Sequence, residues 1–241
     1  MEIVFIAVLF TVAFLYSSVG HGGASGYLAL MALYGLDPVY MQSSALTLNL
    51  FVSSIAFYSF YKAGYFKWKI LLPFVITSMP MAFLGARMDI EPRTYKIILG
   101  ICLLIAVMRI LISFSREFES PKPPPFLIAA PVGAVLGFFS GMIGIGGGII
   151  LSPILILLHW ANMKETAAVS AAFIFLNSAS GLLGLSISGI QLSPNIIIWI
   201  FVVISGGFLG SYISSYRLKS SILKYLLATV LLVASIKLLL T

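Results

Sequence analysis

Two glycine clusters in this sequence have the composition of an anion-binding backbone. They are Gly20–Gly23, which reads GHGG, and Gly144–Gly148, which reads GIGGG. Glycine lets the backbone approach a ligand closely and adopt conformations in which successive N–H groups face an anion. A helix that starts at such a cluster adds free N–H groups and about half a positive charge. The clusters therefore predict an anion site built largely from backbone.

Both clusters interrupt long stretches that carry no charged residue. The first lies within Ile3–Leu36, and the second lies within Phe126–Met163, which is 38 residues long. One membrane span needs only about 20 apolar residues, so each stretch must enter the membrane, break and turn. The segments after the breaks, Ser25–Gly35 and Ile149–His159, would be helices of about 16 Å, half a membrane thick. Irregular backbone at that depth needs protein cover or a polar cavity, which predicts a buried site near the midplane.

The composition is that of a polytopic membrane protein. Of the 241 residues, 61% are hydrophobic and 9% are charged, whereas soluble domains have about 25% charged residues. The net charge of +7 comes from residues in short loops, which indicates cytoplasmic loops rather than nucleic-acid binding. Cys102 is the single cysteine, so no intrachain disulfide can form. The first apolar stretch lacks a basic leader and a cleavage site, which favours a retained helix.

The chain divides into two repeats, residues 1–113 and 126–241, joined by a charged, proline-rich linker at 114–125. The glycines of the first cluster precede those of the second by 124 residues, and the triplet FLG at 83–85 precedes the FLG at 208–210 by 125. Each repeat has five hydrophobic segments, an odd number, so the second repeat would enter the membrane from the opposite side. We therefore expect an all-α fold of two inverted repeats, each with a glycine-broken helix pair. The ten expected segments are Ile3–Val19, Ser25–Gly35, Gln42–Tyr61, Ile70–Ala86, Tyr95–Ile112, Phe126–Ile143, Ile149–His159, Thr166–Ser186, Pro194–Ser214 and Ile222–Leu240.

The loop charges predict the orientation in the membrane. If the chain starts outside, the basic turn at 62–69, the linker, Lys164 and the basic segment 217–224 share one side. The positive-inside rule makes that side cytoplasmic. The N- and C-termini are then expected outside the cytoplasmic membrane, and the linker is expected in the cytoplasm.

Candidate site residues come from the two breaks and from the polar side chains of the spans that follow. His21 is the one ionisable side chain in either break, and it would either take up a proton for coupling or serve as a neutral hydrogen-bond donor. The glycines would either bind the anion or only allow close helix packing, and the hydroxyls and amides would either touch the ligand or bond to neighbouring helices. The candidate substrate-binding residues are Gly20, His21, Gly22, Gly23, Ser25, Ser44, Thr47, Asn49, Gly144, Gly146, Gly147, Gly148, Ser170 and Asn177.

The sequence contains no motif of a metal or nucleotide enzyme. We find no GxxxxGK loop, no HExxH, no cysteine cluster and no paired carboxylates in the apolar stretches. The expectation is therefore a protein that is not an enzyme and needs no metal or cofactor, against the alternative of an intramembrane enzyme that uses a serine.

At these residues the sequence resembles the TauE/SafE family of sulfite exporter-like transporters. The resemblance rests on Gly144–Gly148 with Pro153, on the fainter copy at Gly20–Ala24, and on small polar residues after each half-helix. It implies secondary transport of sulfite, organosulfonates or related small anions, driven by protons or another ion. The first copy departs from the pattern at His21 and Ala24 and has no counterpart of Pro153, so the halves of the site are expected to contribute unequally.

The predicted function is therefore transport of a small sulfur-containing anion across the cell membrane. The alternatives are a passive anion channel and a membrane scaffold that transports nothing. The expected partners are the anion, the lipid bilayer and coupling protons, without nucleic acid. The sequence leaves open the identity of the anion, the direction of flux, the coupling ion and whether the protein forms a homo-oligomer.

Overall fold

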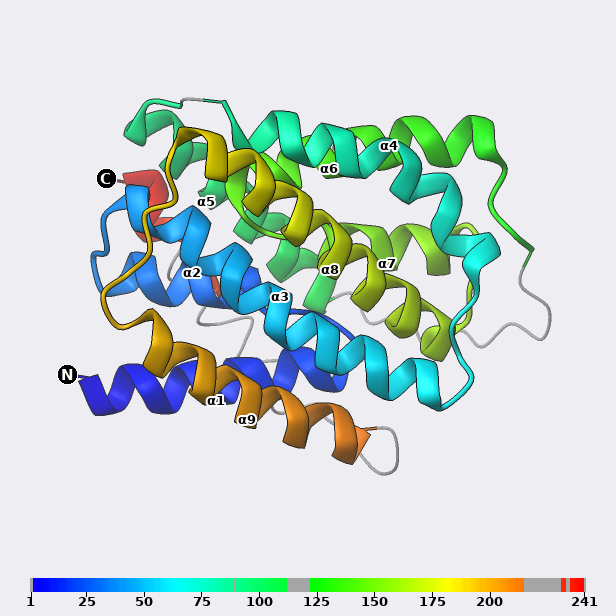
Figure 1. The fold of residues 1–241 in the computed structure, drawn as a ribbon, viewed down its shortest axis with the longest axis horizontal. Helices are drawn as coiled ribbons and strands as arrows, with labels where there is room; N and C mark the ends of the chain where they lie inside the picture. The colour runs from blue at the N-terminus through cyan, green and yellow to red at the C-terminus, as the bar shows by residue number, and fades with distance from the viewer. Residues whose placement is uncertain (1, 89, 112–121, 215–230, 233–234, 241) are drawn as a thin grey trace.

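The computed structural model describes residues 2–88, 90–111, 122–214, 231–232 and 235–240 (Figure 1). These residues form helices joined by turns, without a strand among them, which confirms the all-helical prediction. Residues 114–121 of the linker, 112 of the fifth expected segment, and 222–230 and 233–234 of the last expected segment lie outside the described residues. The helices are α1 (Glu2–Ser18), α2 (Ala24–Leu33), α3 (Pro38–Lys62), α4 (Trp68–Ala86), α5 (Pro92–Leu111), α6 (Phe126–Ile143), α7 (Gly148–Leu157), α8 (Met163–Ser188) and α9 (Ile196–Ser214).

Five of the described helices, α3, α4, α6, α8 and α9, are long and apolar enough to cross a membrane. The helix α1 and the two helices after the glycine breaks are shorter but also apolar. The fold is therefore that of a multi-pass membrane protein.

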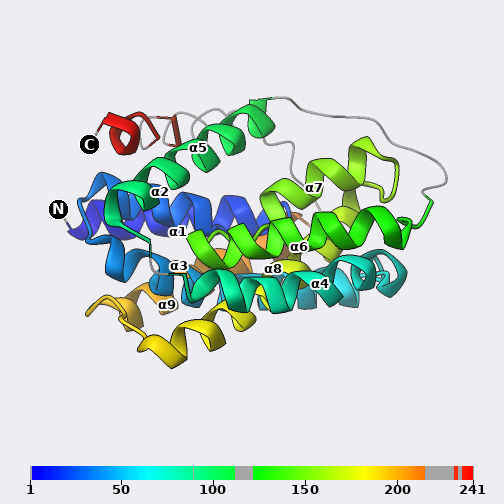
Figure 2. The same cartoon turned by 90° about the horizontal axis from the view of Figure 1, so that it is seen from above.

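The helices α2 and α7 are the two short helices that the sequence predicts. Each has 10 residues, which corresponds to about 15 Å, and each begins and ends within two residues of its predicted bounds. In Figures 1 and 2, α2 and α7 extend toward opposite ends of the bundle. Two half-length helices thus occupy the interior, one toward each end.

The long helices pack in pairs that correspond between the halves of the chain. The pair α1 and α9 matches the pair α6 and α4, because exchanging the two halves turns one pair into the other. A Cβ on Gly85 would lie 2.1 Å from Phe138 O, and a Cβ on Gly210 would lie 2.1 Å from Phe14 O. Gly85 and Gly210 are 125 residues apart, and their partners Phe14 and Phe138 are 124 apart. Both FLG glycines therefore allow equivalent close contacts between helices.

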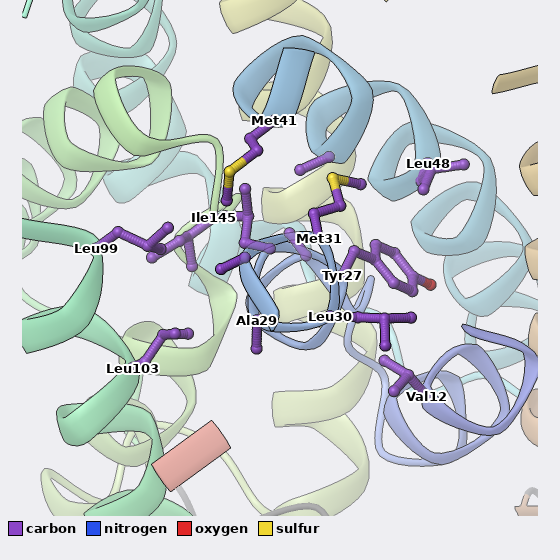
Figure 3. Packing of buried hydrophobic residues seen from close by; sticks show 14 of the residues in the cluster. Val12, Tyr27, Ala29, Leu30, Met31, Met41, Leu48, Leu99, Leu103 and Ile145 are labelled. Carbon is purple, nitrogen blue, oxygen red and sulfur yellow. The ribbon is translucent and has the colours of Figure 1, made fainter. Parts of the chain in front are cut away.

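Apolar side chains enclose α2. Tyr27 and Met31 of this helix are fully buried, and Figure 3 shows them among side chains of other elements. The neighbours labelled there are Val12 of α1, Met41 and Leu48 of α3, Leu99 and Leu103 of α5, and Ile145 of the second break. Protein therefore covers the broken backbone, as a break within a membrane requires.

One end of the bundle, which we call the lysine-rich end, carries the α3–α4 turn and the start of α8. Lys67 Nζ lies 2.5 Å from Glu165 Oε1, and Lys164 Nζ donates to Tyr65 OH at 2.9 Å. The N–H of Lys122, next to the linker, donates to the carbonyl of His159 at 3.1 Å. The segments that the sequence predicts to share one side thus lie together where they are described.

The other end, which we call the Arg87 end, carries the ends of α2, α4 and α8 and the start of α3. The N–H of Ser193 donates to Ser44 Oγ at 3.2 Å. Lys237 Nζ donates to the carbonyls of Ala32 and Leu33, both at 3.0 Å. A cation at a helix C-terminus opposes the partial negative charge there, so Lys237 stabilises α2 in its orientation.

Candidate functional site

The glycines of the two breaks adopt backbone conformations that other residues rarely take. Gly23 and Gly147 are the N-cap residues of α2 and α7, with φ of 94° and 73°. Gly20, Gly144 and Gly146 also have positive φ, at 74°, 88° and 80°. Left-handed backbone costs an L-residue about 1–2 kcal/mol, so the breaks need glycine at these positions. Gly20 is also confined by packing, because a Cβ there would lie 2.5 Å from Ala167 O.

The two breaks meet at Asn49, a fully buried residue of α3. Its Oδ1 accepts a hydrogen bond from the N–H of Ala24, the first residue of α2, at 3.1 Å. Its Nδ2 donates to the carbonyl of Ile145 in the second break at 3.3 Å and to Ser178 Oγ at 3.4 Å. One side chain therefore bridges Ala24 and Ile145, which lie on opposite sides of the chain midpoint.

Close packing around Asn49 brings the N-terminal ends of both half-helices together. A Cβ on Gly22 would lie 2.1 Å from Asn49 Oδ1, and a Cβ on Gly146 would lie 2.3 Å from Asn49 Nδ2. The same two Cβ positions lie 3.0 and 2.9 Å from Ile174 Cγ2. Gly148, the first residue of α7, also faces Ile174, with a Cβ position 2.3 Å from Cδ1. Asn49 and Ile174, which are 125 residues apart, thus both contact the two breaks.

His21 begins a buried chain of hydrogen bonds. Its side chain is 3% exposed, with Nδ1 2.9 Å from the carbonyl of Val19 and Nε2 2.9 Å from Ser152 Oγ. Ser152 Oγ lies 2.9 Å from Ser170 Oγ and 2.9 Å from the carbonyl of Gly148. A carbonyl only accepts hydrogen bonds, so Nδ1 carries a proton, and Ser152 Oγ donates to the carbonyl of Gly148. In a neutral ring with its proton on Nδ1, Nε2 is an acceptor that competes with Gly148 O for the one hydroxyl proton of Ser152. The chain connects the first break to α7 and α8.

Protonation of His21 would end this competition. The charged ring donates from both nitrogens, so Ser152 would accept from Nε2 and keep its own donation to Gly148 O. A proton on the first break would therefore change a hydrogen bond at the start of α7.

Four of the predicted site residues point elsewhere. Ser44 bonds to the α8–α9 loop at the Arg87 end, and Thr47 Oγ1 donates to the carbonyl of Ser43 in its own helix at 2.8 Å. Ser25 Oγ lies 2.7 Å from Tyr16 OH. Asn177 Nδ2 donates to the carbonyl of Phe173 at 2.8 Å, and its Oδ1 is buried without a hydrogen-bond partner among the described residues.

Two residues at the breaks are absent from the predicted set. Ser152 belongs to the chain of His21, and its position within the apolar half-helix α7 is the sequence signal that would have indicated it. Gln42 Nε2 donates to the carbonyls of Gly141 and Met142, at 2.7 and 3.1 Å, at the end of α6. No local pattern distinguishes Gln42 from other polar residues of α3.

The arrangement is suited to binding an anion without charged ligands. It offers backbone N–H groups at two helix N-termini, an amide, two hydroxyls and one imidazole. Among the described residues, no group of three His, Cys, Asp or Glu side chains is placed to hold a metal ion. The chemistry of these groups is that of hydrogen bonding.

Comparisons with known proteins agree with this architecture. The family model described as "Sulfite exporter TauE/SafE" matches residues 5–238. The "Probable membrane transporter protein y4hK" of Sinorhizobium fredii is 37% identical over 234 residues, which cover 95% of each chain. The "Probable membrane transporter protein YunE" of Bacillus subtilis is 26% identical over 149 residues, covering 54% of this chain and 52% of that one. No solved structure matches. With a match over nearly its whole length, the chain belongs to the sulfite exporter TauE/SafE family.

Proposed function

We propose that this protein is a secondary transporter of small sulfur-containing anions, such as sulfite and organosulfonates, across the cytoplasmic membrane. The observation that carries the proposal is the meeting of both half-helix N-termini around Asn49 in the protein interior. The family and the names of its relatives, two probable membrane transporters, support transport as the activity. The anion would bind where the two breaks meet.

Electrostatics supports an anion as cargo. A Lys or Arg at the midplane costs at least about 2.5 kcal/mol on insertion scales, and neither break contains one. Two helix N-termini offer partial positive charge without that cost. Asn49 Oδ1 already accepts from Ala24 N–H, which marks where an oxygen of the anion would be received.

The paired packing of the helices supports an inverted repeat of residues 1–113 and 126–241. A two-fold relation between the halves would produce the equivalent contacts at Gly85 and Gly210. It would also place Asn49 and Ile174 at equivalent positions beside the two breaks. Sites between discontinuous helices of such repeats suit alternating access. The clustering of lysines at one end supports a cytoplasmic linker and termini on the outer side.

The burial of the site favours a carrier over a channel. Asn49, Ser152 and Ser170 are fully buried, and His21 is nearly so. An open pore would leave its polar lining in water, whereas a carrier closes around its site in each state. The scaffold alternative leaves the geometry of two converging breaks without a purpose, since close helix packing alone does not need half-helices.

Flux measurements test the proposal. The purified protein in proteoliposomes is expected to take up labelled sulfite with saturation, and an imposed proton gradient is expected to accelerate uptake. Small organosulfonates should compete. Unsaturable flux would indicate the channel, and the absence of flux under every gradient would contradict anion transport.

Replacing His21 with alanine is expected to flatten the pH dependence of sulfite flux. The reason is that protonation of His21 would change its hydrogen bond with Ser152, whose hydroxyl donates to the carbonyl of Gly148 at the start of α7. The measurement is the initial rate of uptake across a pH series. His159→Ala is the matched control, because His159 is exposed at the end of α7 and should leave the profile unchanged. A His21→Ala profile like that of the unmodified protein would make the histidine a structural hydrogen-bond donor.

A further inference from the structure

A cavity of about 410 Å³ lies at the Arg87 end of the bundle. It is bounded by the start of α3 and α5, the ends of α4, α6 and α8, and the loop after α8. The residues that matter for its chemistry are Gln42, Ser43, Arg87, Tyr95, Met142 and Gln191. The candidate site described above does not include this cavity.

The floor of the cavity is the last turn of α6, directly before the second glycine break. Tyr95 OH donates to the carbonyl of Ile143 at 2.9 Å, and Gln42 Nε2 donates to the carbonyls of Gly141 and Met142. A Cβ on Gly144 would lie 3.0 Å from Gln42 O. The layer formed by Gln42 and the end of α6 therefore separates the cavity from the break.

Arg87 gives the cavity its charge. Among the described residues that line it, Arg87 is the one side chain that is charged at neutral pH. Its Cζ lies 5.7 Å from the centroid of the Phe83 ring, an arrangement that restrains the guanidinium through its face and leaves the edges, where the N–H groups point, uncovered by that ring. A guanidinium binds the paired oxygens of an oxyanion with two parallel hydrogen bonds.

The other charged groups described at this end do not line the cavity. Glu91 and Arg93 are exposed at the start of α5, and Lys237 Nζ is bonded to the end of α2. The positive charge that an anion meets inside the cavity is therefore that of Arg87.

We propose that this cavity is a capture site for sulfite- or sulfonate-type oxyanions, which Arg87 binds before the anion passes Gln42 to the glycine breaks. The inference rests on the proposed function, because it names the route by which the anion reaches the central site. It predicts that Arg87 determines the affinity for the oxyanion at the Arg87 end, whereas the central site determines the rate of the transport step.

Cysteine modification tests binding in the cavity without relying on transport. Val39 lines the cavity and is half-exposed, so Val39→Cys in a Cys102→Ser background provides the reporter thiol in detergent micelles. The measurement is the ratio of two reaction rates of this thiol, that with the anionic 2-sulfonatoethyl methanethiosulfonate divided by that with its cationic trimethylammonium analogue. The ratio should be higher when Arg87 is present. Arg87→Gln should lower this ratio about tenfold, as loss of a charge-assisted contact would. Ethanesulfonate should protect the thiol only when Arg87 is present.

Arg93→Gln is the matched control, since it removes the same charge from the same end outside the cavity. An equal fall in the ratio with Arg93→Gln, or protection by ethanesulfonate that persists in Arg87→Gln, would overturn the capture site.

Transport kinetics separate this inference from the proposed function. Arg87→Gln should raise the KM for sulfite about tenfold with kcat unchanged, and Arg87→Lys should give an intermediate KM. Saturable flux in the unmodified protein with an unaltered KM in Arg87→Gln would reject the capture site and leave the transporter standing. Arg87-dependent protection without any flux would support the capture site and reject the transporter.

Discussion

Replacing Gly146 with alanine is expected to abolish sulfite uptake, whereas the same replacement at Gly64 is expected to preserve it. The two glycines have nearly the same backbone conformation, with φ of 80° and 81°. Each alanine therefore brings a similar left-handed strain of about 1–2 kcal/mol. The difference lies in their surroundings, because a Cβ on Gly146 would lie 2.3 Å from Asn49 Nδ2 and a Cβ on Gly64 has no atom within 4 Å.

The expected loss follows from displacement of the Asn49 side chain. Its amide cannot keep its bonds to Ala24 and Ile145 with a methyl group in its place, so both breaks lose their shared contact. The measurement is the initial rate of labelled-sulfite uptake, with the thermal midpoint of each purified variant as a check of folding. Similar midpoints with uptake retained only in Gly64→Ala would support the site, and full uptake in a folded Gly146→Ala would contradict it.

The two half-helices could be predicted from the sequence because their signals are local. A glycine cluster within a charge-free stretch marks a break, and 10 or 11 apolar residues are too few to span a bilayer. The bounds of α2 and α7 therefore agree with the predicted ones within two residues. Loop charge likewise grouped segments that the structure brings together at the lysine-rich end, at Lys67, Lys122 and Lys164.

The partners of the polar side chains could not be predicted in the same way. Successive residues of a helix are rotated by about 100°, so Thr47 and Asn49 project from different sides of α3 although they lie two residues apart. A hydroxyl in a membrane helix can bond to its own backbone, as Thr47 does, which gives it no required direction. Ser152 bonds both to its own helix and to His21, 131 residues away. Only the tertiary packing reveals the second contact.

The two residues that contact both breaks differ in polarity, and the residue types alone do not identify them as a pair. The two amides, Asn49 and Asn177, suggest equivalent roles, but with an offset of 125 residues the counterpart of Asn49 is Ile174. Both of these contact Gly22 and Gly146. One face of the meeting point is therefore polar and the other apolar, which would suit the proposed sulfonate cargo, with oxygens on one side and a less polar group on the other.

Replacing Asn49 with leucine is expected to abolish transport and to lower stability. Leucine has a similar volume but leaves the N–H of Ala24 and the carbonyl of Ile145 without their bonds to Asn49. Buried groups that lose their partners cost about 1–3 kcal/mol each in proteins, and interhelical bonds in membranes average about 0.6 kcal/mol. The thermal midpoint should therefore fall measurably, and sulfite uptake should be lost because the half-helix N-termini no longer share a partner.

Asn177→Leu provides the comparison, because Asn177 is equally buried and lies on the corresponding helix of the other half. Its amide bonds only to Phe173 O of its own helix among the described residues, so leucine should keep most of the stability and most of the uptake. Uptake rates and midpoints of both variants, measured side by side, decide the point. Equal losses would mean that burial of an amide, and not the bridge between the breaks, is what transport requires. Loss of uptake in Asn177→Leu alone would indicate that the anion binds at α8 and not at the breaks.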